Sequence, residues 1–298
     1  MQKKKRSETP LEEPKIENET LTGKYSSPAG HDYSPIASIN DVMGREKEIW
    51  SGVDKDLVED VDLNTKGQLA LIKELSKYYP EMPFEEEKKE NLRYFFNNGW
   101  FCHSDAIMLY SIMRHYKPKK IVEVGSGVSS AAMLDTRDLF LSDELSLTFI
   151  EPFPDRLYTM ISEEDKKKSK IIPTILQLAD ITLFDQLEEN DILFIDSSHV
   201  SKVGSDVNYI FFDILPRLKS GVIIHFHDIF YPFEYPKDWV YGGRNWNECY
   251  MLRALLMNNT DYQIMLFVEY LHIHHYNAFA KMPLCYNNRG CSFWMRKL

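Results

Sequence analysis

The chain has 298 residues, 44% of them hydrophobic, and its formal net charge is -10. This length and composition suffice to bury a core in one large domain, or in one domain with an appendage. The excess of acidic residues argues against a nucleic-acid backbone or an anionic membrane as the main partner. We therefore expect a globular protein with neither nucleic acid nor a membrane as its partner.

The four cysteines give no sign of a disulfide framework or a zinc ribbon, because they are far apart and form no C-x-x-C pair. They are Cys102, Cys249, Cys285 and Cys291. No segment approaches the roughly 20 apolar residues that cross a bilayer. The opening residues combine basic side chains with glutamates, which is untypical of an organellar transit peptide. The sequence therefore predicts a cytoplasmic protein without a membrane span.

The first 117 residues divide into a tail and a helical extension. Residues 1–40 carry several prolines and many charges but few apolar side chains, so burial would not offset the entropy of ordering them. We predict a disordered or loosely ordered tail there and a helical extension over residues 41–117. Within the extension, Asp62 to Tyr79 and Ser104 to Tyr116 show helical spacing of apolar residues. Ser104 is the expected N-cap of the second helix.

From residue 118 to residue 298, short β-branched runs alternate with helical patterns. Such runs are typical of buried parallel strands joined by crossover helices, and thus of an α/β fold with a doubly wound, mostly parallel sheet. The predicted strands are Ile121 to Val124, Leu147 to Ile150, Lys170 to Ile172, Ile192 to Ile195 and Val222 to Phe226, and the clearest helices are Asp206 to Leu218 and Asn247 to Asn258. Tyr262 to Val268 and Ser292 to Arg296 are expected as further strands joined by a long irregular link. The last of these is expected to pair antiparallel at the sheet edge.

The first motif of chemical interest is a strand that ends in Glu123-Val-Gly125-Ser126-Gly127 and then opens a helix. The two glycines let the backbone turn sharply and approach a ligand, and the free N–H groups of the following helix can bind it. Glu151 closes the next predicted strand, where a carboxylate can accept hydrogen bonds from both hydroxyls of a ribose. A plain strand-to-helix turn and a solvated strand end are the alternatives that these residues leave open.

These motifs, together with two further strings, resemble the class I methyltransferases that use S-adenosylmethionine. The strings run from Lys119 to Gly127, Phe149 to Pro152, Asp191 to His199 and Leu215 to Val222. The resemblance covers roughly Tyr94 to Leu298, and the DSSH, GSDV and HFHDI segments resemble a bacterial small-molecule subgroup. It implies a seven-stranded Rossmann-like sheet, S-adenosylmethionine as the cofactor and a small-molecule substrate.

The resemblance also implies cofactor roles for individual residues. Glu123 would lie near the methionine end of the cofactor, Gly125 to Gly127 would pass beneath it, and Glu151 would hold the ribose. Asp180 would lie near the adenine, with a plain surface aspartate as the alternative.

Two other classes of function stay open at the level of the sequence. A dinucleotide-binding loop would carry a third glycine where this chain has Ser130, and a pyrophosphate needs the close backbone approach more than a sulfonium does. The loop therefore favours S-adenosylmethionine, with an NAD(P)-dependent oxidoreductase as the first alternative. A non-catalytic module that binds a cofactor or a partner is the second. The oligomeric state is open, and a homo-oligomer is compatible with the sequence.

Polar residues at the ends of two predicted neighbouring strands form a second group. Asp196 and His199 follow the fourth strand, and His225, His227 and Asp228 end the fifth. Adjacent strands lie about 4.8 Å apart, so such groups can converge on one ion or substrate. Similarity to the catechol O-methyltransferase type implies a divalent metal, Mg²⁺ or another ion, on Asp196, His227 and Asp228. It also implies a catalytic His199, acting as the base beside Asp196.

Histidine in place of an oxygen ligand makes a magnesium site less favourable and admits manganese, iron, zinc or no metal. The alternatives are that His227 and Asp228 shape the pocket or bind substrate, and that His225 is a core histidine. His199 would then make a structural hydrogen bond to the neighbouring loop.

An aromatic segment from Tyr231 to Trp246 follows the fifth strand and is rich in proline and glycine. We expect it to form a lid or substrate wall with Gly242 and Gly243 as hinges, a packed connection being the alternative. Trp100 and Phe101 are expected at the mouth of the site. Methyl transfer needs a nucleophile that is held in line and deprotonated, which a histidine or a metal can achieve. We therefore predict S-adenosylmethionine-dependent methylation of a small molecule at a hydroxyl oxygen.

Overall fold

In the computed structural model, residues 27–141 and 144–298 are described, and they form two compact units divided between Gly44 and Arg45. The first unit contains α1 (Ile39–Gly44). Residues 1–26 of the predicted tail lie outside the described residues. The second unit contains the sheet together with most of the predicted helical extension. The domain boundaries at residues 40 and 117 stay predictions.

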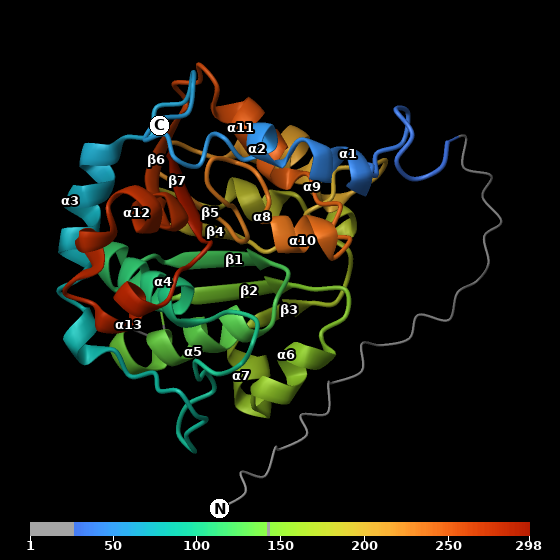
Figure 1. Ribbon diagram of the computed structural model, residues 1–298. Coiled ribbons are helices and arrows are strands. Elements are labelled where there is room, and N and C mark those ends of the chain that lie inside the picture. The colour runs from blue at the N-terminus through green and yellow to red at the C-terminus, as the bar shows by residue number, and fades with distance from the viewer. Residues whose placement is uncertain (1–26, 142–143) are drawn as a thin grey trace, which may run out of the picture. The chain divides into compact units, whose positions relative to one another are not determined.

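A seven-stranded sheet is the centre of the second unit (Figure 1). Its strand order is β3-β2-β1-β4-β5-β7-β6, and β1 to β5 run parallel while β7 is antiparallel to both of its neighbours. The strands are β1 (Lys120–Val124), β2 (Ser146–Ile150), β3 (Lys170–Ile172), β4 (Ile192–Ile195), β5 (Ile223–Phe226), β6 (Tyr262–Phe267) and β7 (Phe293–Lys297). The doubly wound, mostly parallel, Rossmann-like sheet predicted from the sequence is confirmed.

The antiparallel strand β7 comes from the C-terminal segment that was predicted to pair antiparallel at the sheet edge, but β6 and not β7 forms that edge. It lies between β5 and β6, and Phe293 of β7 pairs with Phe226 of β5. Because this pairing is antiparallel, the residues that precede β7 lie beside the residues that follow β5. The backbone N–H of Ile229 donates to the carbonyl of Cys291 (3.0 Å) and extends the contact beyond the strand ends.

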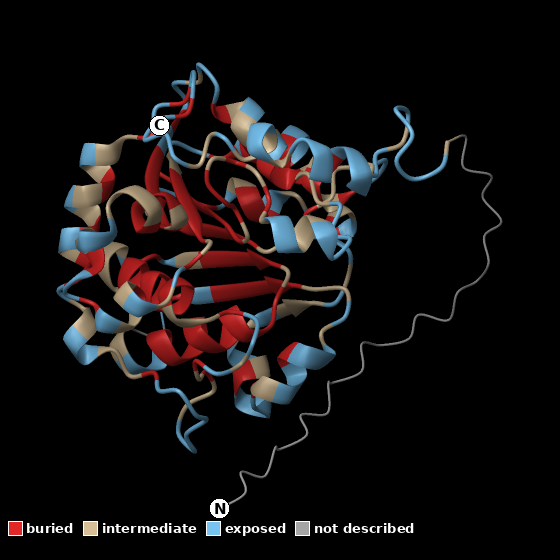
Figure 2. Cartoon of the chain, viewed as in Figure 1, coloured by how far each residue is buried: buried red, intermediate tan, exposed pale blue. Residues whose placement is uncertain are grey.

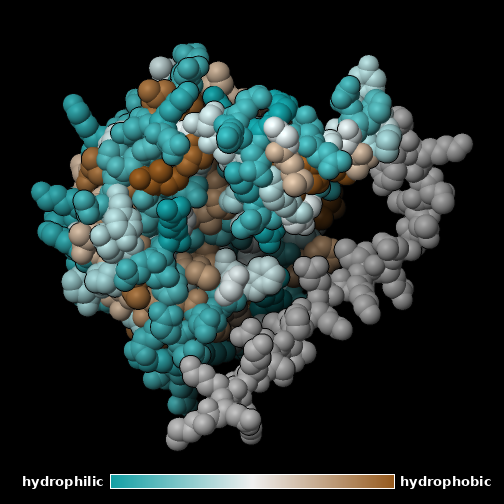
Figure 3. Space-filling view, viewed as in Figure 1, coloured by the Kyte–Doolittle hydropathy of each residue, from teal (hydrophilic) through white to brown (hydrophobic). Residues whose placement is uncertain are grey.

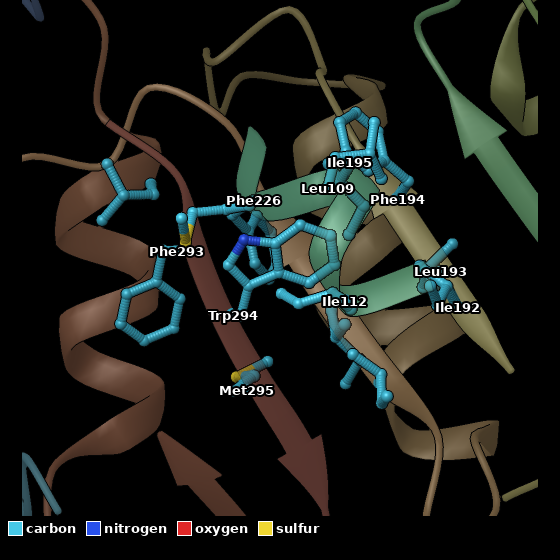
Figure 4. Close-up of a cluster of buried hydrophobic side chains, with 14 of the residues drawn as sticks. Leu109, Ile112, Ile192, Leu193, Phe194, Ile195, Phe226, Phe293, Trp294 and Met295 are labelled. Atoms are coloured by element: carbon cyan, nitrogen blue, oxygen red, sulfur yellow. The ribbon is translucent and has the colours of Figure 1, made fainter. Parts of the chain in front are cut away.

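The central strands are buried on both faces, which explains their uninterrupted apolar sequences (Figure 2). Trp294 of β7 is fully buried, and its ring centroid lies 6.1 Å from that of Phe194 on β4 in an edge-to-face arrangement. Figure 4 shows Leu109 and Ile112 of α4 (His103–Tyr116) in the same cluster. The apolar face of α4 therefore packs directly against the sheet.

Helices cover both faces of the sheet, and in Figure 1 α4 and α5 lie on one side of β1 and β2. Those of the second unit, besides α4, are α2 (Glu46–Ile49), α3 (Thr65–Leu75), α5 (Val128–Phe140), α6 (Asp155–Met160), α7 (Glu163–Lys168), α8 (Thr182–Asp185), α9 (Asp206–Tyr209), α10 (Lys237–Tyr241), α11 (Glu248–Leu256), α12 (Val268–His274) and α13 (Pro283–Asn287), with short 3-10 helices η1 (Tyr79–Glu81), η2 (Leu176–Leu178) and η5 (Tyr276–Phe279). The face seen in Figure 3 is mostly hydrophilic. None of the helices in the described residues is long and apolar enough to cross a bilayer.

Two predictions about helices need correction. The helix predicted from Ser104 begins one residue earlier with Cys102 as its N-cap, because the buried Ser104 hydroxyl donates instead to the carbonyl of Asn288. The link between β6 and β7, predicted to be irregular, contains α12, η5 and α13. Leu271 and Phe279 of this link are fully buried, and such packing stabilises helices that are too short to form alone.

The segment predicted as one helix from Asp206 to Leu218 is helical but changes type along its length. It begins as α9, continues as the π-helix η3 (Ile210–Ile214) and ends as the 3-10 helix η4 (Leu215–Arg217). Pro216 has no N–H to donate to the preceding turn and clashes with a regular α-helical backbone there. The change of helical type accommodates this proline.

Asp191 ties the starts of β1 and β4 together. Its buried carboxylate accepts the backbone N–H groups of Lys119 (2.9 Å) and Lys120 (2.8 Å) at Oδ1, and that of Glu188 (3.0 Å) at Oδ2. Hydrogen bonds to a charged acceptor are roughly twice as strong as neutral ones. The alignment of two central strands, and the position of the loops at their other ends, therefore depends on this side chain.

Replacing Asp191 with Ala should lower the free energy of unfolding by about 2 to 4 kcal/mol, because three backbone N–H groups lose a buried acceptor. Asp213→Ala is the matched control, since that carboxylate is exposed and its removal should change stability by less than about 0.5 kcal/mol. Urea unfolding followed by circular dichroism measures both variants. Equal unfolding midpoints would contradict the role assigned to Asp191.

Candidate active site

A cavity of about 610 Å³ lies at the carboxyl ends of the parallel strands. The strand order explains the position of the cavity. Strands β2 and β3 lie on one side of β1, and strands β4 and β5 lie on its other side. The loops that follow β1 and β4 therefore diverge and leave a crevice between them. The cavity is lined by Gly99, Trp100, Phe101, Gly125, Ser126, Gly127, Val128, Ser129, Glu151, Arg156, Asp196, Ser197, Ser198, His199, His227, Asp228, Trp239, Arg244 and Trp246. All of the predicted site residues except Glu123 and Asp180 are therefore brought to one cavity.

The loop after β1 passes directly against the backbone that follows β4. Gly125 has a φ of 81°, and a Cβ at this position would lie 1.8 Å from the carbonyl oxygen of Asp196. Only glycine combines this backbone conformation with so close an approach. The backbone N–H of Gly125 donates to the carbonyl of Ile150 (3.0 Å), and that of Ser126 donates to Oε2 of Glu151 (3.1 Å). The glycine loop is thereby fixed to the ends of β2 and β4.

Glu123 lies beneath the glycine loop rather than at the cavity wall. Its fully buried carboxyl group accepts hydrogen bonds from the hydroxyls of Ser129 (2.5 Å) and Ser130 in the first turn of α5. Burial raises the pKa of Glu123 to about 8. The residue predicted to lie near the methionine end of the cofactor thus anchors the start of α5.

Glu151 presents its carboxylate to the cavity at the end of β2. It accepts the backbone N–H groups of Ser126 (3.1 Å) and Phe153 (2.8 Å), and burial raises its pKa. Arg156, in the first turn of α6, also lines the cavity, and its guanidinium carbon lies 3.9 Å from the ring centroid of Trp100. This distance is typical of a cation–π contact. An acidic side chain, Glu151, and a cationic one, Arg156, therefore face the same cavity.

Asp180 is exposed and does not line the cavity. Its Oδ1 accepts the backbone N–H (3.0 Å) and the hydroxyl (2.8 Å) of Thr182 at the start of α8. These bonds lower the pKa of Asp180. The geometry gives the side chain a role in the helix start, and its contact with the adenine stays a prediction.

His199 lies between two carboxylates. Its Nδ1 is 2.9 Å from Oε2 of Glu248 at the start of α11, and its Nε2 is 3.3 Å from Oδ1 of Asp196. Glu248 is fully buried, and its other oxygen accepts the hydroxyl of Ser197 (2.8 Å). The backbone N–H groups of Asn247 (3.0 Å) and Glu248 (3.2 Å) donate to the carbonyl of His199. These contacts hold His199 in a left-handed backbone conformation with a φ of 58° and fix its ring.

The surrounding charges favour the protonated form of His199. Burial alone would lower its pKa, but the interactions with Asp196 and Glu248 outweigh burial and raise the pKa of His199 well above its usual value. Burial opposes ionisation of Asp196 as well, yet its interactions with His199 and His227 lower the pKa of that carboxyl. An imidazolium beside two carboxylates is therefore the resting state, and the ring accepts a further proton only after losing this one.

His225 is a core residue, which is the alternative that the sequence left open. It is fully buried within β5, and its ring stacks on that of Phe194 with the centroids 3.8 Å apart. Burial lowers the pKa of His225 well below its usual value. The neutral ring therefore belongs to the hydrophobic core and not to the cavity.

The three residues predicted to hold a metal do not form a compact set of ligands. Nε2 of His199 contacts Asp196 and also lies 3.9 Å from Oδ2 of Asp228, so an imidazole takes the place between the two carboxylates. Among the described residues, the three donor atoms that lie within 4.8 Å of one another belong to Asp105, His227 and Cys291. The arrangement therefore does not fit a magnesium site that includes Asp196, and that site stays a prediction.

The segment after β5 forms a wall of the cavity, as predicted. Trp239, Arg244 and Trp246 line it, and the guanidinium carbon of Arg244 lies 4.1 Å from the ring centroid of Trp239. The ring of Trp246 stacks on that of His199 with the centroids 4.2 Å apart. Trp100 and Phe101, predicted at the mouth, line the same cavity. The walls thus combine aromatic faces with cationic side chains.

Reasoning from the sequence missed Glu248 and Arg156. Glu248 opens a predicted helix 49 residues after His199, and no local pattern indicates what its side chain contacts. Arg156 carried a weak signal, because it begins the helix that follows Glu151 and so lies close to the same strand end. Both assignments needed the three-dimensional arrangement.

Comparison with known proteins identifies the family. Residues 122–229 match the sequence profile of the family described as "Methyltransferase domain". A protein of Archaeoglobus fulgidus described as uncharacterized is 34% identical over 165 residues, which cover 55% of this chain and 74% of that protein. Two solved structures are similar at low identity. The S-adenosylhomocysteine-bound methyltransferase PaMTH1 of Podospora anserina is 17% identical with a TM-score of 0.43, covering 76% of this chain and 88% of that one. The O-methyltransferase TomG of Streptomyces achromogenes, solved with S-adenosylmethionine, is 13% identical with a TM-score of 0.42, covering 76% and 89%.

The chain belongs to the class I S-adenosylmethionine-dependent methyltransferases. The matched region runs from β1 to the residues just after β5, and it therefore includes the glycine loop, Glu151, Asp196 and His199. The cofactor is S-adenosylmethionine, and the class of reaction is methyl transfer. The family assignment favours this activity over the nicotinamide-dependent alternative.

Gly125→Ala should weaken binding of S-adenosylhomocysteine by more than about tenfold, since relieving the clash with the Asp196 carbonyl would displace the loop at a cost above 1.4 kcal/mol. Gly204→Ala is the matched control. Gly204 also has a positive φ, of 71°, but a Cβ there meets nothing within 4 Å, so the variant shares the backbone strain without the clash. Isothermal titration calorimetry measures both affinities. A similar Kd for the two variants would argue against the loop as the cofactor site.

Proposed function

We propose that the protein transfers the methyl group of S-adenosylmethionine to a hydroxyl oxygen of a small molecule, with His199 as the base. The observation that carries the proposal is the pairing of His199 with the buried Glu248 at the cavity. One ring nitrogen is engaged by that carboxylate, and the other faces Asp196, which lines the cavity. A ring oriented in this way is suited to move a proton at a fixed point.

The cofactor half of the proposal uses the glycine loop and Glu151. Gly125 to Gly127 expose backbone without side chains, and the carboxylate of Glu151 is available to accept the hydroxyls of a ribose. Glu123 would act indirectly, by holding the start of α5 through two serine hydroxyls. Bound S-adenosylmethionine would supply the electrophilic methyl group.

His199 would first lose the proton that it carries in the resting state and would then take the proton of the attacking hydroxyl. In the neutral ring, Glu248 accepts the N–H at Nδ1, which leaves the lone pair at Nε2 free. The carboxylates that raise the pKa of the ring also make its neutral form a stronger base and stabilise the imidazolium that results. Asp196 would hold the protonated ring in place. Correct positioning of the acceptor can contribute about 7 to 11 kcal/mol to lowering the barrier.

A small acceptor fits the size and lining of the cavity. Its volume of about 610 Å³ lies in the usual range for small-molecule sites. Trp239 and Trp246 offer aromatic faces beside His199, and Arg244 offers a cation on the same wall. A planar acceptor lying against the tryptophans would bring its hydroxyl toward Nε2 of His199.

Three further predictions belong to the same proposal and rest on the sequence. A divalent metal on Asp196, His227 and Asp228 stays a prediction of the resemblance, the position of His199 between the two carboxylates argues against it, and adding EDTA to the assay tests it. A cytoplasmic location follows from the expected reducing compartment, and the four cysteines are free thiols. A homo-oligomer is tested by light scattering.

Glu151→Ala should raise the Kd for S-adenosylhomocysteine by about 10- to 100-fold, because hydrogen bonds to a charged acceptor contribute about 1.5 to 3 kcal/mol. Glu163→Ala is the control, since Glu163 is exposed on α7 outside the cavity. Calorimetric titration with and without EDTA measures the affinities. An unchanged Kd for Glu151→Ala would remove Glu151 from the ribose site.

His199→Asn should lower kcat by about 100- to 10,000-fold, the range that loss of a general base typically costs, while cofactor affinity is kept. Asparagine suits the left-handed backbone conformation at this position better than alanine does. Glu248→Gln should lower kcat in the same direction, because it perturbs the orientation and charge of the ring. The assay follows transfer of labelled methyl groups to a panel of phenols, catechols, hydroxy acids and amines.

His115→Ala serves as the control for this test, because His115 lies in the last turn of α4, outside the cavity. Retained turnover in His199→Asn with full cofactor binding would exclude His199 as the base. Transfer to amines alone across the panel would overturn the hydroxyl acceptor and leave the cofactor site intact.

A further inference from the structure

Four side chains with metal-binding atoms converge next to the cavity. Asp105 comes from the first turn of α4, His227 and Asp228 follow β5, and Cys291 precedes β7. The antiparallel pairing of β5 with β7 brings the last three together, because it places the residues after one strand beside those before the other. His227 and Asp228 line the cavity, whereas Asp105 and Cys291 do not. The cluster therefore extends behind the cavity wall.

Backbone contacts hold Asp105 and Cys291 in place. Oδ1 of Asp105 accepts the backbone N–H groups of Cys291 (3.0 Å) and Ser292 (2.9 Å) and the hydroxyl of Ser292 (2.6 Å). A Cβ at Gly290 would lie 2.6 Å from the same oxygen, so a glycine at this position permits the approach. These bonds use Oδ1 and leave Oδ2 of Asp105 directed at the thiol.

Of three separations between the remaining donor atoms, two match those of tetrahedral ligands, and the third, between Sγ of Cys291 and Oδ1 of Asp228, is shorter. Sγ of Cys291 lies 3.7 Å from Oδ2 of Asp105 and 3.0 Å from Oδ1 of Asp228, and Nε2 of His227 lies 3.6 Å from the same Asp228 oxygen. Metal bonds of about 2.0 to 2.3 Å at tetrahedral angles separate ligand atoms by roughly 3.3 to 3.8 Å. One donor atom each of Asp105, His227 and Cys291 also lies within 4.8 Å of the others. Small side-chain movements would bring all four onto one ion.

The imidazole of His227 lacks the partners that a buried ring normally has. His227 is only 4% exposed, its Nδ1 is buried without a hydrogen-bond partner, and its Nε2 is beyond hydrogen-bond distance from Asp228. Buried polar groups are almost always hydrogen-bonded, and an exception calls for a missing partner. The atom without a partner is Nδ1, whereas Nε2 is the nitrogen that faces Asp228. A cation bound at Nε2 would give the ring a ligand bond and neutralise the neighbouring carboxylates.

We propose that Asp105, His227, Asp228 and Cys291 bind one divalent transition-metal ion of the zinc type. A thiolate and an imidazole favour Zn²⁺ and similar ions over the hard Mg²⁺, which prefers oxygen ligands. This ligand set omits Asp196, and it therefore differs from the set predicted by resemblance. The proposal does not depend on which acceptor is methylated.

Metal uptake releases the protons that the ligands carry. The S–H bond of Cys291 breaks as the sulfur–metal bond forms, and the proton leaves to solvent. Asp228 and Asp196 outweigh burial and raise the pKa of His227, and burial raises the pKa of Asp105, so any proton on these two groups also leaves to solvent. The ring then binds through its lone pair, and both carboxylates bind as anions. No group changes its oxidation state. Without metal, burial raises the pKa of Cys291 well above its usual value and keeps the thiol protonated.

Titration of the full chain with Co²⁺ tests the site, because cobalt bound to a thiolate has a sulfur-to-metal absorption band in the near ultraviolet. The wild-type protein should take up one equivalent, show this band with the visible bands of tetrahedral cobalt, and lose both on addition of Zn²⁺. Cys291→Ser should abolish the near-ultraviolet band and weaken binding by more than about 100-fold, since loss of even a group outside the ligands typically costs about 10- to 100-fold. Asp105→Asn should weaken binding but keep the band.

Cys102→Ser is the matched control, because Cys102 is also partly buried and lies outside the cluster. Circular dichroism checks the folding of each variant. If Cys291→Ser does not fold, alkylation of the wild-type protein replaces it: Zn²⁺ should protect Cys291 but not Cys102 from iodoacetamide, as read by peptide mass spectrometry. Absence of the sulfur band in the wild type, its persistence in Cys291→Ser, or equal alkylation with and without Zn²⁺ would overturn the proposal. Titration of the same samples with S-adenosylhomocysteine reports the cofactor site separately.

Discussion

The close approach of Gly125 to the carbonyl of Asp196 is the constraint on which the site depends. β1 and β4 end side by side where the order of the sheet reverses, and the loop after β1 can cross there only as bare backbone. This crossing sets where the N–H of Ser126 meets Glu151, and it fixes the start of the turn that leads from Asp196 to His199. The glycine loop and the histidine are therefore positioned relative to each other by main chain, which is stiffer than side-chain contact.

The same crowding explains how so many acidic groups coexist around one cavity. Glu123, beneath the loop, has its pKa raised to about 8 by burial, so it is largely neutral at pH 7 and places no charge under the glycine loop. Glu248 is buried as well, but it faces His199 and the hydroxyl of Ser197, which compensate a negative charge. Glu151 keeps one side toward backbone N–H groups and the other toward the cavity. Each carboxylate is thus either neutralised or paired, as a buried charge must be.

The sheet could be predicted from the sequence because its signals are local. Runs such as Ile192 to Ile195 are apolar on both faces, and the glycines after β1 mark the turn into α5. The partners of His199 could not be predicted, because Glu248 reaches it from a helix 49 residues away. The prediction of Ser104 as an N-cap was wrong for a related reason, because its hydroxyl donates a hydrogen bond to the carbonyl of the distant Asn288. Local patterns fix elements and strand ends, whereas side-chain partners across the sheet depend on tertiary packing.

His227, which follows β5, stands where the resemblance implies an oxygen ligand. Cys291, which precedes β7, lies beside it. Because β7 inserts beside β5, residue 291 must lie next to residues 227 and 228, and a thiol at that position has the same preference for softer ions as the imidazole. Asp228 contacts both groups of residues, with one oxygen 3.0 Å from Sγ of Cys291 and the other 3.9 Å from Nε2 of His199. An ion held on the Cys291 side would draw on the charge of this carboxylate and so change the field at His199. Asp228 therefore couples the proposed metal cluster electrostatically to the proposed base.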